Sequence, residues 1–251
     1  MSDRNQHHAV VTGGSKGIGM AVVERLLDDD HRVTAVARDR TALDALVDHL
    51  GDRFGDALAV RSCDVTDEAA VVELFETLAP VDILVNNAGI SHSAPISRIT
   101  LEDWNRHLAV NATGAFLCMR AVVDPMRERG WGRIVTVASV TGHEGAPYIA
   151  AYAASKHAVL GLTRSVAAEL QGSGVTANVV SPSYVDTPMT RQTLARIEDR
   201  TGRNQAEALE ALLSVTRLNR LIPPEEVAGA VAFLIASPSV NGQSVIIDGA
   251  A

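Results

Sequence analysis

Short apolar runs rich in β-branched residues alternate along nearly the whole chain with longer segments in which apolar residues recur at helical spacing. The runs predict strands near residues 8–12, 32–37, 57–62, 82–85, 132–138, 175–180 and 243–247. The longer segments predict helices near residues 18–28, 41–50, 67–78, 101–129, 150–171 and 224–236. Residues 83–85 and 134–138 are apolar at almost every position, as in strands covered on both faces. The pattern therefore predicts an α/β fold with a doubly wound, seven-stranded parallel sheet and helices on both faces.

No internal repeat, low-complexity tract or linker divides the sequence, so we expect residues 1–251 to form a single domain. One region departs from the alternation of strands and helices. Residues 187–223 separate the sixth predicted strand from the last predicted helix, and only residues 207–214 within them show a helical pattern. A long excursion beyond the carboxyl edge of a parallel sheet is more typical of a substrate lid than of a second domain.

Composition and charge disfavour several kinds of partner. The formal net charge is −8 and aromatic residues make up 4% of the chain, which argues against nonspecific nucleic-acid binding and against a base-stacking surface. Cys63 and Cys118 stand far apart in apolar segments without metal-ligand spacing, so we expect two buried, reduced thiols and no metal site. The sequence has neither a long apolar run nor the apolar segment of a signal peptide, and we expect a cytoplasmic protein without membrane association.

A glycine-rich segment follows the first predicted strand and opens the first predicted helix. Its glycines, Gly13, Gly17 and Gly19, allow a tight turn and a close approach of backbone N–H groups to a diphosphate. The N-terminus of the helix adds the positive end of its dipole. The segment therefore predicts the phosphate-binding turn of a dinucleotide site.

The end of the second predicted strand bears on which dinucleotide binds. A carboxylate there accepts hydrogen bonds from the adenosine ribose and repels a 2′-phosphate. Ala37 stands where that acid is expected and Arg38 follows it, so Arg38 and Lys16 together favour NADP(H). In the alternative interpretation, Arg38 is a solvated surface residue, Asp39 reaches the ribose hydroxyls and the cofactor is NAD(H).

Tyr152 and Lys156 are four positions apart in a predicted helix, so their side chains share one face. An ammonium beside a phenol favours the phenolate and lowers a pKa that ordinarily lies near 10. The pair therefore predicts a group that donates and accepts protons near neutral pH. A tyrosine and a lysine at this spacing are common by chance. The pair indicates a catalytic site only because the rest of the chain supplies the other parts of such a site.

The glycine turn and the Tyr152–Lys156 pair resemble motifs of the short-chain dehydrogenase/reductase family, in its subgroup of about 250 residues. The same resemblance extends to residues 63–65, residues 86–89, Asn111, Ser139 and residues 182–187. The resemblance covers essentially the whole chain. It implies a single-domain Rossmann fold, a nicotinamide cofactor and a homo-oligomer, either a tetramer or a dimer. It also implies hydride transfer between the nicotinamide and a carbonyl carbon without a metal.

The resemblance also implies roles for individual residues. Tyr152 resembles the general acid/base, and Lys156 resembles the residue that binds the nicotinamide ribose and lowers the tyrosine pKa. Ser139 resembles the residue that hydrogen-bonds the substrate oxygen, and Asn111 the helix residue that holds a water for proton relay. The implied cofactor-binding residues are Gly13, Ser15, Lys16, Gly17, Ile18, Gly19, Arg38, Asp64, Val65, Asn87, Gly89, Tyr152, Lys156, Pro182, Val185 and Thr187.

Substrate contacts are expected from the loops at the carboxyl edge of the sheet and from the lid. The candidate substrate residues are His92, His143, Tyr148, Ser183 and Met189, with solvent exposure as the alternative for His143. The other histidines of the helices and turns are interpreted as surface or helix-face residues, namely His31, His49, His107 and His157. The lid arginines, Arg191, Arg196, Arg200 and Arg203, either meet phosphates of coenzyme A or an acidic carrier protein, or pair with Glu198, Asp199 and Glu207.

Three functions are consistent with these observations. The favoured one is an NADP(H)-dependent carbonyl reductase acting on a 3-oxoacyl thioester or a polyketide-like ketone. The second is an NAD-dependent catabolic dehydrogenase of a secondary alcohol, 3-hydroxybutyrate or a hydroxyacyl-CoA. The third is a non-catalytic dinucleotide sensor, which the presence of all four expected catalytic residues disfavours.

Overall fold

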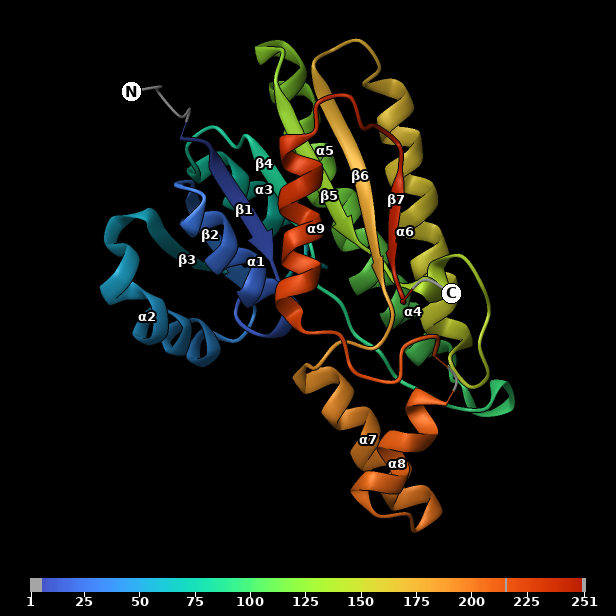
Figure 1. Cartoon of the computed structure of the whole chain (residues 1–251). Coiled ribbons are helices and arrows are strands. Elements are labelled where there is room, and N and C mark those ends of the chain that lie inside the picture. Colours follow the sequence, from blue (N-terminus) through green and yellow to red (C-terminus); the bar gives the residue numbers. More distant parts are fainter. Residues whose placement is uncertain (1–5, 215, 250–251) are drawn as a thin grey trace.

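The computed structural model describes residues 6–214 and 216–249. Within them, seven parallel strands form one sheet in the order β3-β2-β1-β4-β5-β6-β7 (Figure 1). The strands are β1 (His8–Thr12), β2 (Arg32–Ala37), β3 (Leu58–Ser62), β4 (Ile83–Asn86), β5 (Gly132–Val137), β6 (Val175–Pro182) and β7 (Ser244–Ile247). The predicted α/β fold with a doubly wound parallel sheet is confirmed, and the architecture is Rossmann-like.

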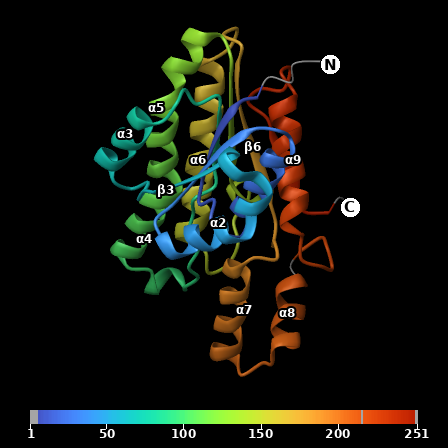
Figure 2. The same ribbon diagram turned by 90° about the vertical axis from the view of Figure 1, so that its left-hand side faces the viewer.

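Helices cover both faces of the sheet. They are α1 (Gly17–Asp28), α2 (Arg40–Phe54), α3 (Glu68–Thr77), α4 (Leu101–Leu108), α5 (Gly114–Arg129), α6 (Ala150–Glu169), α7 (Pro188–Thr201), α8 (Gln205–Leu213) and α9 (Pro224–Ala236). Helices α1, α2 and α9 pack on one face, whereas α3, α5 and α6 pack on the other (Figures 1 and 2). Successive strand residues point to opposite faces, so Ala9 and Val11 join the first core cluster and Val10 joins the second.

The direction in which successive strands are added to the sheet reverses between β1 and β4, because β2 and β3 extend the sheet on one side of β1 and β4 to β7 extend it on the other. At such a reversal the loops after two neighbouring strands diverge and leave a crevice at the carboxyl edge of the sheet, where ligands bind. The glycine turn follows β1, residues 87–89 follow β4, Ser139 follows β5, and residues 183–187 follow β6. The fold therefore brings four sequence motifs to one edge.

Several helices begin at a side chain that satisfies a free backbone N–H group. Asp39, Asp67 and Thr100 precede α2, α3 and α4, and each side chain accepts a hydrogen bond from the backbone three residues further on. The first helix differs, because Lys16 precedes α1 in an extended conformation and makes no side-chain capping hydrogen bond.

The prediction of one continuous helix over residues 101–129 is wrong in its middle. A π-helical segment, Ala109–Thr113, separates α4 from α5. The side chain of Asn111 at its centre bonds both backbone groups of Ile90, which belongs to the loop after β4. Local periodicity cannot reveal this interruption, since its partner lies 21 residues away in the chain.

The excursion over residues 187–223 holds two helices where the sequence indicated one. The unpredicted helix, α7, is largely polar, so its apolar periodicity is weak. Its ends do carry signals, because Thr187 caps it, Pro188 opens it and Gly202 follows it with φ of +70°. Helices α7 and α8 enclose a small apolar cluster of Leu194, Ala208 and Leu212. Figure 2 shows them as a pair that projects beyond the carboxyl edge of the sheet.

Cys63 and Cys118 are buried free thiols, as expected. Among the described residues, no helix combines the length and the apolar character that a membrane crossing requires. Over the same residues, no group of three or more histidine, cysteine and carboxylate side chains is arranged to hold a metal ion.

Candidate active site

The glycine turn lies between the end of β1 and the start of α1. Gly13 and Gly17 adopt φ of +65° and +55°, the left-handed region that favours glycine. A side chain at Gly19 would collide with the carbonyl oxygen of Gly13, so the turn closes only with glycine there. Ser15 is buried inside the turn and Lys16 is exposed beside it. Because no side chain caps α1, its first N–H groups suit the oxygens of a diphosphate.

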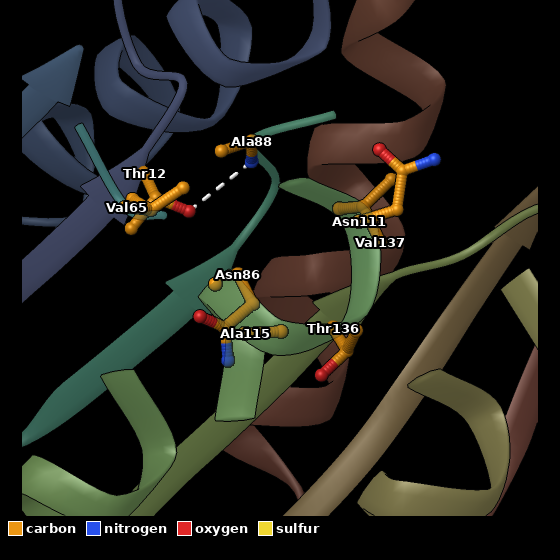
Figure 3. Close-up of a pocket in the computed structure, with 9 residues that line it drawn as sticks. Thr12, Val65, Asn86, Ala88, Asn111, Ala115, Thr136 and Val137 are labelled. Carbon is orange, nitrogen blue, oxygen red and sulfur yellow. Dashed lines mark hydrogen bonds between the residues drawn. The ribbon is translucent and has the colours of Figure 1, made fainter. Parts of the chain in front are cut away.

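The loop after β4 is tied to this turn. The backbone N–H of Asn87 donates to Thr12 Oγ1 at 3.0 Å, and its side-chain amide donates to the carbonyl oxygens of Thr12 and Gly13 at 3.0 and 3.1 Å. Ala88 donates to the same Thr12 hydroxyl, as Figure 3 shows. A hollow of about 10 Å³ lies beneath these contacts and is lined in part by Asn86 and Asn111. The fold therefore joins two predicted cofactor segments across the reversal point.

Beyond the end of β2, Arg38 donates to the carboxylate of Asp64 at 3.3 Å, and both side chains are partly exposed. Burial by itself raises the pKa of Asp64, but hydrogen bonds from Thr66 and Arg38 outweigh it and lower that pKa. Val65 is buried. The carboxylate of Asp39 accepts a hydrogen bond from the Ala42 backbone and caps α2. This is the carboxylate that, in the NAD(H) interpretation, would bind the ribose hydroxyls.

Four predicted catalytic residues lie on the elements beside the crevice. Ser139 follows β5 and begins the short turn Val140–Gly142, and its hydroxyl accepts hydrogen bonds from the Thr141 backbone and hydroxyl at 3.3 and 3.0 Å. Tyr152 and Lys156 are one turn apart on α6. The Lys156 Nζ lies 5.7 Å from the centre of the Tyr152 ring and donates to the carbonyl oxygen of Val137 at 2.9 Å.

The electrostatics of this pair differ from the sequence prediction. Burial raises the pKa of Tyr152 to about 12; a hydrogen bond with Ser139 acts in the opposite direction, and Tyr184 adds to the rise. Burial lowers the pKa of Lys156 to about 8. The expectation that Lys156 holds the phenol below its ordinary pKa is therefore wrong for this geometry, because burial is the largest cause of both shifts and Lys156 is not among the groups that shift the pKa of Tyr152.

Asn111 holds the loop after β4 in place. Its side-chain oxygen accepts from the backbone of Ile90 at 2.8 Å, and its amide donates to the Ile90 carbonyl and to Ser155 Oγ at 3.0 and 2.9 Å. Gly89 lies against this amide, because a Cβ there would be 3.3 Å from Asn111 Oδ1 and 3.7 Å from Lys156 Nζ. These contacts bring a predicted cofactor residue between two predicted catalytic residues.

The segment after β6 closes the other side of the crevice. Pro182 ends β6, and Val185 forms an isolated parallel bridge with Ile222. Thr187 caps α7 and lies against the glycine turn, because a Cβ at Gly17 would be 3.1 Å from its methyl group. A chain segment far from the N-terminus in sequence thus meets the glycine turn.

Comparison with known proteins decides the family. The family model described as short chain dehydrogenase matches residues 7–198. The chain belongs to the short-chain dehydrogenase family. It is therefore an NAD(P)-dependent oxidoreductase that acts on CH–OH or keto groups.

Relatives of this dehydrogenase are similar to it over nearly their whole length. A 3-oxoacyl-[acyl-carrier-protein] reductase from Synechocystis sp. is 37% identical, over 96% of this chain and 95% of its own. A D-beta-hydroxybutyrate dehydrogenase from Rhizobium meliloti is 32% identical, over 96% of both chains. The structure of an actinorhodin polyketide ketoreductase variant with NADPH superposes with a TM-score of 0.91 at 34% identity, covering 99% of this chain and 98% of that one.

The candidate substrate residues of the dehydrogenase occupy different environments. His92 and Tyr148 are exposed, Met189 is 38% exposed, and Ser183 donates its backbone N–H to the Ile247 carbonyl. Tyr148 adopts φ of +68°, which is uncommon for a residue with a side chain. His143 is half-buried, and its ring reaches the sheet. Three of these residues therefore lie where a ligand can reach them.

The interpretation of His107 as a surface or helix-face residue is wrong with respect to exposure. Its side chain is 2% exposed, and Nε2 accepts a hydrogen bond from the His92 backbone at 3.0 Å. Its Nδ1 lies 2.7 Å from the carbonyl oxygen of Asp103, so the proton of the neutral ring resides on Nδ1. His107 thereby positions the loop that carries His92.

The lid arginines make contacts that the sequence did not indicate. Arg196 donates to the carbonyl oxygen of Ser91 at 3.4 Å, and Arg200 donates to that of Ser93 at 3.3 Å. Arg191 pairs with Asp186 at 3.0 Å. Pairing of these three arginines along the helix with Glu198, Asp199 and Glu207 is therefore wrong. Two of them instead link α7 to the loop after β4.

Tyr184 is a site residue that sequence reasoning missed. It packs against the apolar cluster of α7 and α8, and it contributes to the raised pKa of Tyr152. Burial raises the pKa of Tyr184 as well. Its place between Pro182 and Val185, inside a segment already assigned to the cofactor, is the signal that could have found it.

Proposed function

We propose that this chain is an NADPH-dependent reductase of 3-oxoacyl thioesters or related polyketide-like ketones. The observation that carries the proposal is the half-buried Tyr152, whose phenol bonds Ser139 and holds its proton at neutral pH because its pKa is raised to about 12. A protonated phenol beside Ser139 suits proton donation to a ketone oxygen. The similarity to a 3-oxoacyl reductase and to a polyketide ketoreductase supports the substrate class.

The residues around the crevice fit a dinucleotide. The uncapped start of α1 and the close-packed glycine turn suit its diphosphate. Arg38 and Lys16 are the cations for a 2′-phosphate, and Asp39 is engaged as a helix cap. Asp64 and Val65 are proposed to contact the adenine, while Asn87 and Gly89 shape the loop above it. Lys156, Pro182, Val185 and Thr187 are proposed for the nicotinamide side.

The chemistry that the dinucleotide supplies when bound is hydride transfer to the carbonyl carbon. Tyr152 donates its phenolic proton to the carbonyl oxygen as negative charge develops there. The Ser139 hydroxyl accepts hydrogen bonds from Thr141 and bonds Tyr152 in this structure, and it would donate its own proton to the same carbonyl oxygen once a ketone is bound. Lys156 supplies positive charge that stabilises the phenolate left behind. Asn111 keeps the loop after β4 against Lys156.

Steady-state assays test this proposal with 3-oxoacyl thioesters, cyclic ketones and diketones, each with NADPH and with NADH. We expect NADPH-dependent reduction of at least one 3-oxoacyl thioester. Tyr152→Phe should lower kcat/KM by about 10²- to 10⁴-fold while NADPH binding, measured by fluorescence titration, stays within threefold or so. A Phe variant with undiminished turnover would overturn the role of Tyr152, and an equal or greater efficiency with NADH would overturn the cofactor choice.

The second candidate function is NAD-dependent oxidation of a secondary alcohol such as 3-hydroxybutyrate. The 32% identity to a D-beta-hydroxybutyrate dehydrogenase favours it. The same assay run with 3-hydroxybutyrate and NAD separates the two candidates, because the second requires a higher kcat/KM in that direction.

A further inference from the structure

Three polar side chains from three elements meet behind the Ser139 turn. The Nε2 of His143 lies 3.0 Å from Ser181 Oγ and 3.0 Å from Ser244 Oγ, and the two hydroxyl oxygens lie 3.0 Å apart. Ser181 lies on β6 and is fully buried, whereas Ser244 begins β7. We refer to these three residues as the His143 cluster. Its ring and hydroxyls bond one another at the edge formed by β6 and β7, where Ser181 is buried and His143 and Ser244 are half-buried.

The cluster fastens the far end of the turn that begins at Ser139. At the near end, the Ala138 backbone donates to Val180 of β6 at 2.8 Å. The turn is stiffened by the hydrogen bond from Gly142 to the Ser139 carbonyl at 2.9 Å. At the far end, His143 reaches Ser181, the neighbour of Val180. Both ends of the turn are thus attached to two adjacent residues of one strand.

The middle of the turn packs against the helix that carries the phenol. A Cβ at Gly142 would be 3.0 Å from the backbone oxygen of Lys156, so this glycine touches α6. The turn is therefore held between β6 and α6, and the His143 side chain supplies the attachment of its far end to β6 and β7. We expect that losing this attachment lets the turn, with the Ser139 hydroxyl at its start, shift relative to Tyr152.

We propose that His143 is a positioning residue, which holds the Ser139 hydroxyl in place for carbonyl reduction through its hydrogen bonds to Ser181 and Ser244. This inference rests on the proposed reductase function. The neutral ring accepts a hydrogen bond at Nε2 from one of the two hydroxyls, and the second hydroxyl bonds the first. Protonation places a hydrogen on Nε2 and reverses this arrangement.

The surroundings of His143 favour its neutral form. Burial is the largest cause of its lowered pKa, and the charges of Arg164 and His157 on α6 act in the same direction, against Glu144 on its own turn. The cluster partners on β6 and β7 are uncharged serines. Because the folded pKa lies below the ordinary value of 6.5, the aligned state is complete at neutral pH and is lost as the pH falls through the lowered pKa.

Two substitutions at one position test the proposal in the full-length chain. His143→Phe keeps a ring of similar size without a hydrogen-bonding atom, and kcat for ketone reduction should fall about tenfold or more. His143→Gln places an amide where Nε2 lies, and it should retain at least half of the wild-type kcat. The acid limb of the wild-type pH–kcat profile should be absent in His143→Gln. The affinity for NADPH should be unchanged in both variants.

His49→Phe is the matched control, because His49 is an exposed histidine on α2 away from the site. If His143→Phe does not fold, the double variant Ser181→Ala/Ser244→Ala removes the partners and leaves the ring, and the same fall in kcat is expected. A kcat within twofold of wild type in the folded variant, or an unchanged acid limb in His143→Gln, would overturn the inference. Wild-type protein that reduces no ketone would instead overturn the proposed function, and the inference with it.

Discussion

The Nζ atom of Lys156 donates its hydrogen bond to the Val137 carbonyl and lies 5.7 Å from the centre of the Tyr152 ring. Burial raises the pKa of Tyr152 to about 12 and lowers that of Lys156 to about 8, so each group moves toward its neutral form. At neutral pH the phenol holds its proton and the amine is still largely charged. In this state the phenol can donate a proton, as the proposed ketone reduction requires.

The two reaction directions should therefore respond differently to pH. Reduction needs the protonated phenol and the charged Lys156, so its rate should be nearly constant below about pH 7, fall to about half near pH 8 and fall further above it, as Lys156 loses its charge. Alcohol oxidation needs the phenolate, whose fraction rises about tenfold per pH unit below the tyrosine pKa. Rates of both directions across this range check the prediction. An oxidation rate that is flat from pH 7 to about pH 9 would contradict it.

Lys156→Met should stabilise the fold while abolishing most turnover. The fall of the lysine pKa from 10.5 to about 8 corresponds to about 3 kcal/mol against burying the charge. The lost hydrogen bond to Val137 offsets part of this, so we expect a net gain of about 1–2 kcal/mol in the free energy of unfolding at pH 7. Urea unfolding measures the gain, and turnover should drop about 100-fold.

The pH dependence of that gain follows from the sign of the shift. Below about pH 8 the lysine is charged in both states and the full cost applies. Between about 8 and 10.5 the folded state releases the proton first, so the wild type recovers stability and the gain shrinks. Arg98→Met, at an exposed arginine, is the control and should change stability by less than about 0.5 kcal/mol. A Met variant less stable than wild type at pH 7 would refute the prediction.

Arg38→Glu should change the preference between the two cofactors. The substitution removes a cation expected at the 2′-phosphate and places a carboxylate beside Asp64, the present partner of Arg38. We expect KM for NADPH to rise about 10- to 100-fold and KM for NADH to change far less, as loss of a charged hydrogen bond predicts. Arg25→Glu, at an exposed arginine paired with Asp29 on α1, should leave both values unchanged. Equal losses with the two cofactors would argue against a phosphate contact.

Removing the two links between α7 and the loop after β4 should weaken substrate binding. The double variant Arg196→Ala/Arg200→Ala loses the hydrogen bonds to the carbonyl oxygens of Ser91 and Ser93. We expect KM for the ketone to rise about 3- to 10-fold, with kcat little changed, since each of these hydrogen bonds contributes about 1 kcal/mol or less. Hydrogen exchange of the α7 amides should accelerate. Arg203→Ala is the matched control in the same segment. A similar rise in KM in Arg203→Ala would show that the effect of the double variant does not come from the two hydrogen bonds.

Elements with strong local signals could be predicted from sequence, and those that depend on distant partners could not. The seven strands and the helices that cover them follow from apolar runs and helical spacing. The interruption at Asn111 could not be predicted, because its cause is the backbone of Ile90 across a loop. Helix α7 was missed because its apolar residues are few, although Thr187, Pro188 and Gly202 mark its ends.

The sequence alone determined the fold class, the order of the motifs and the identity of the residues that reach the carboxyl edge, because these depend on local spacing and on chain direction. Only the tertiary structure decided how those residues are charged and what holds them. It turned the expected fall of the Tyr152 pKa into a rise, placed His107 in the interior and tied His143 to two strands. Burial and hydrogen bonding depend on which distant segments of the chain come together, and spacing along the sequence carries no such information.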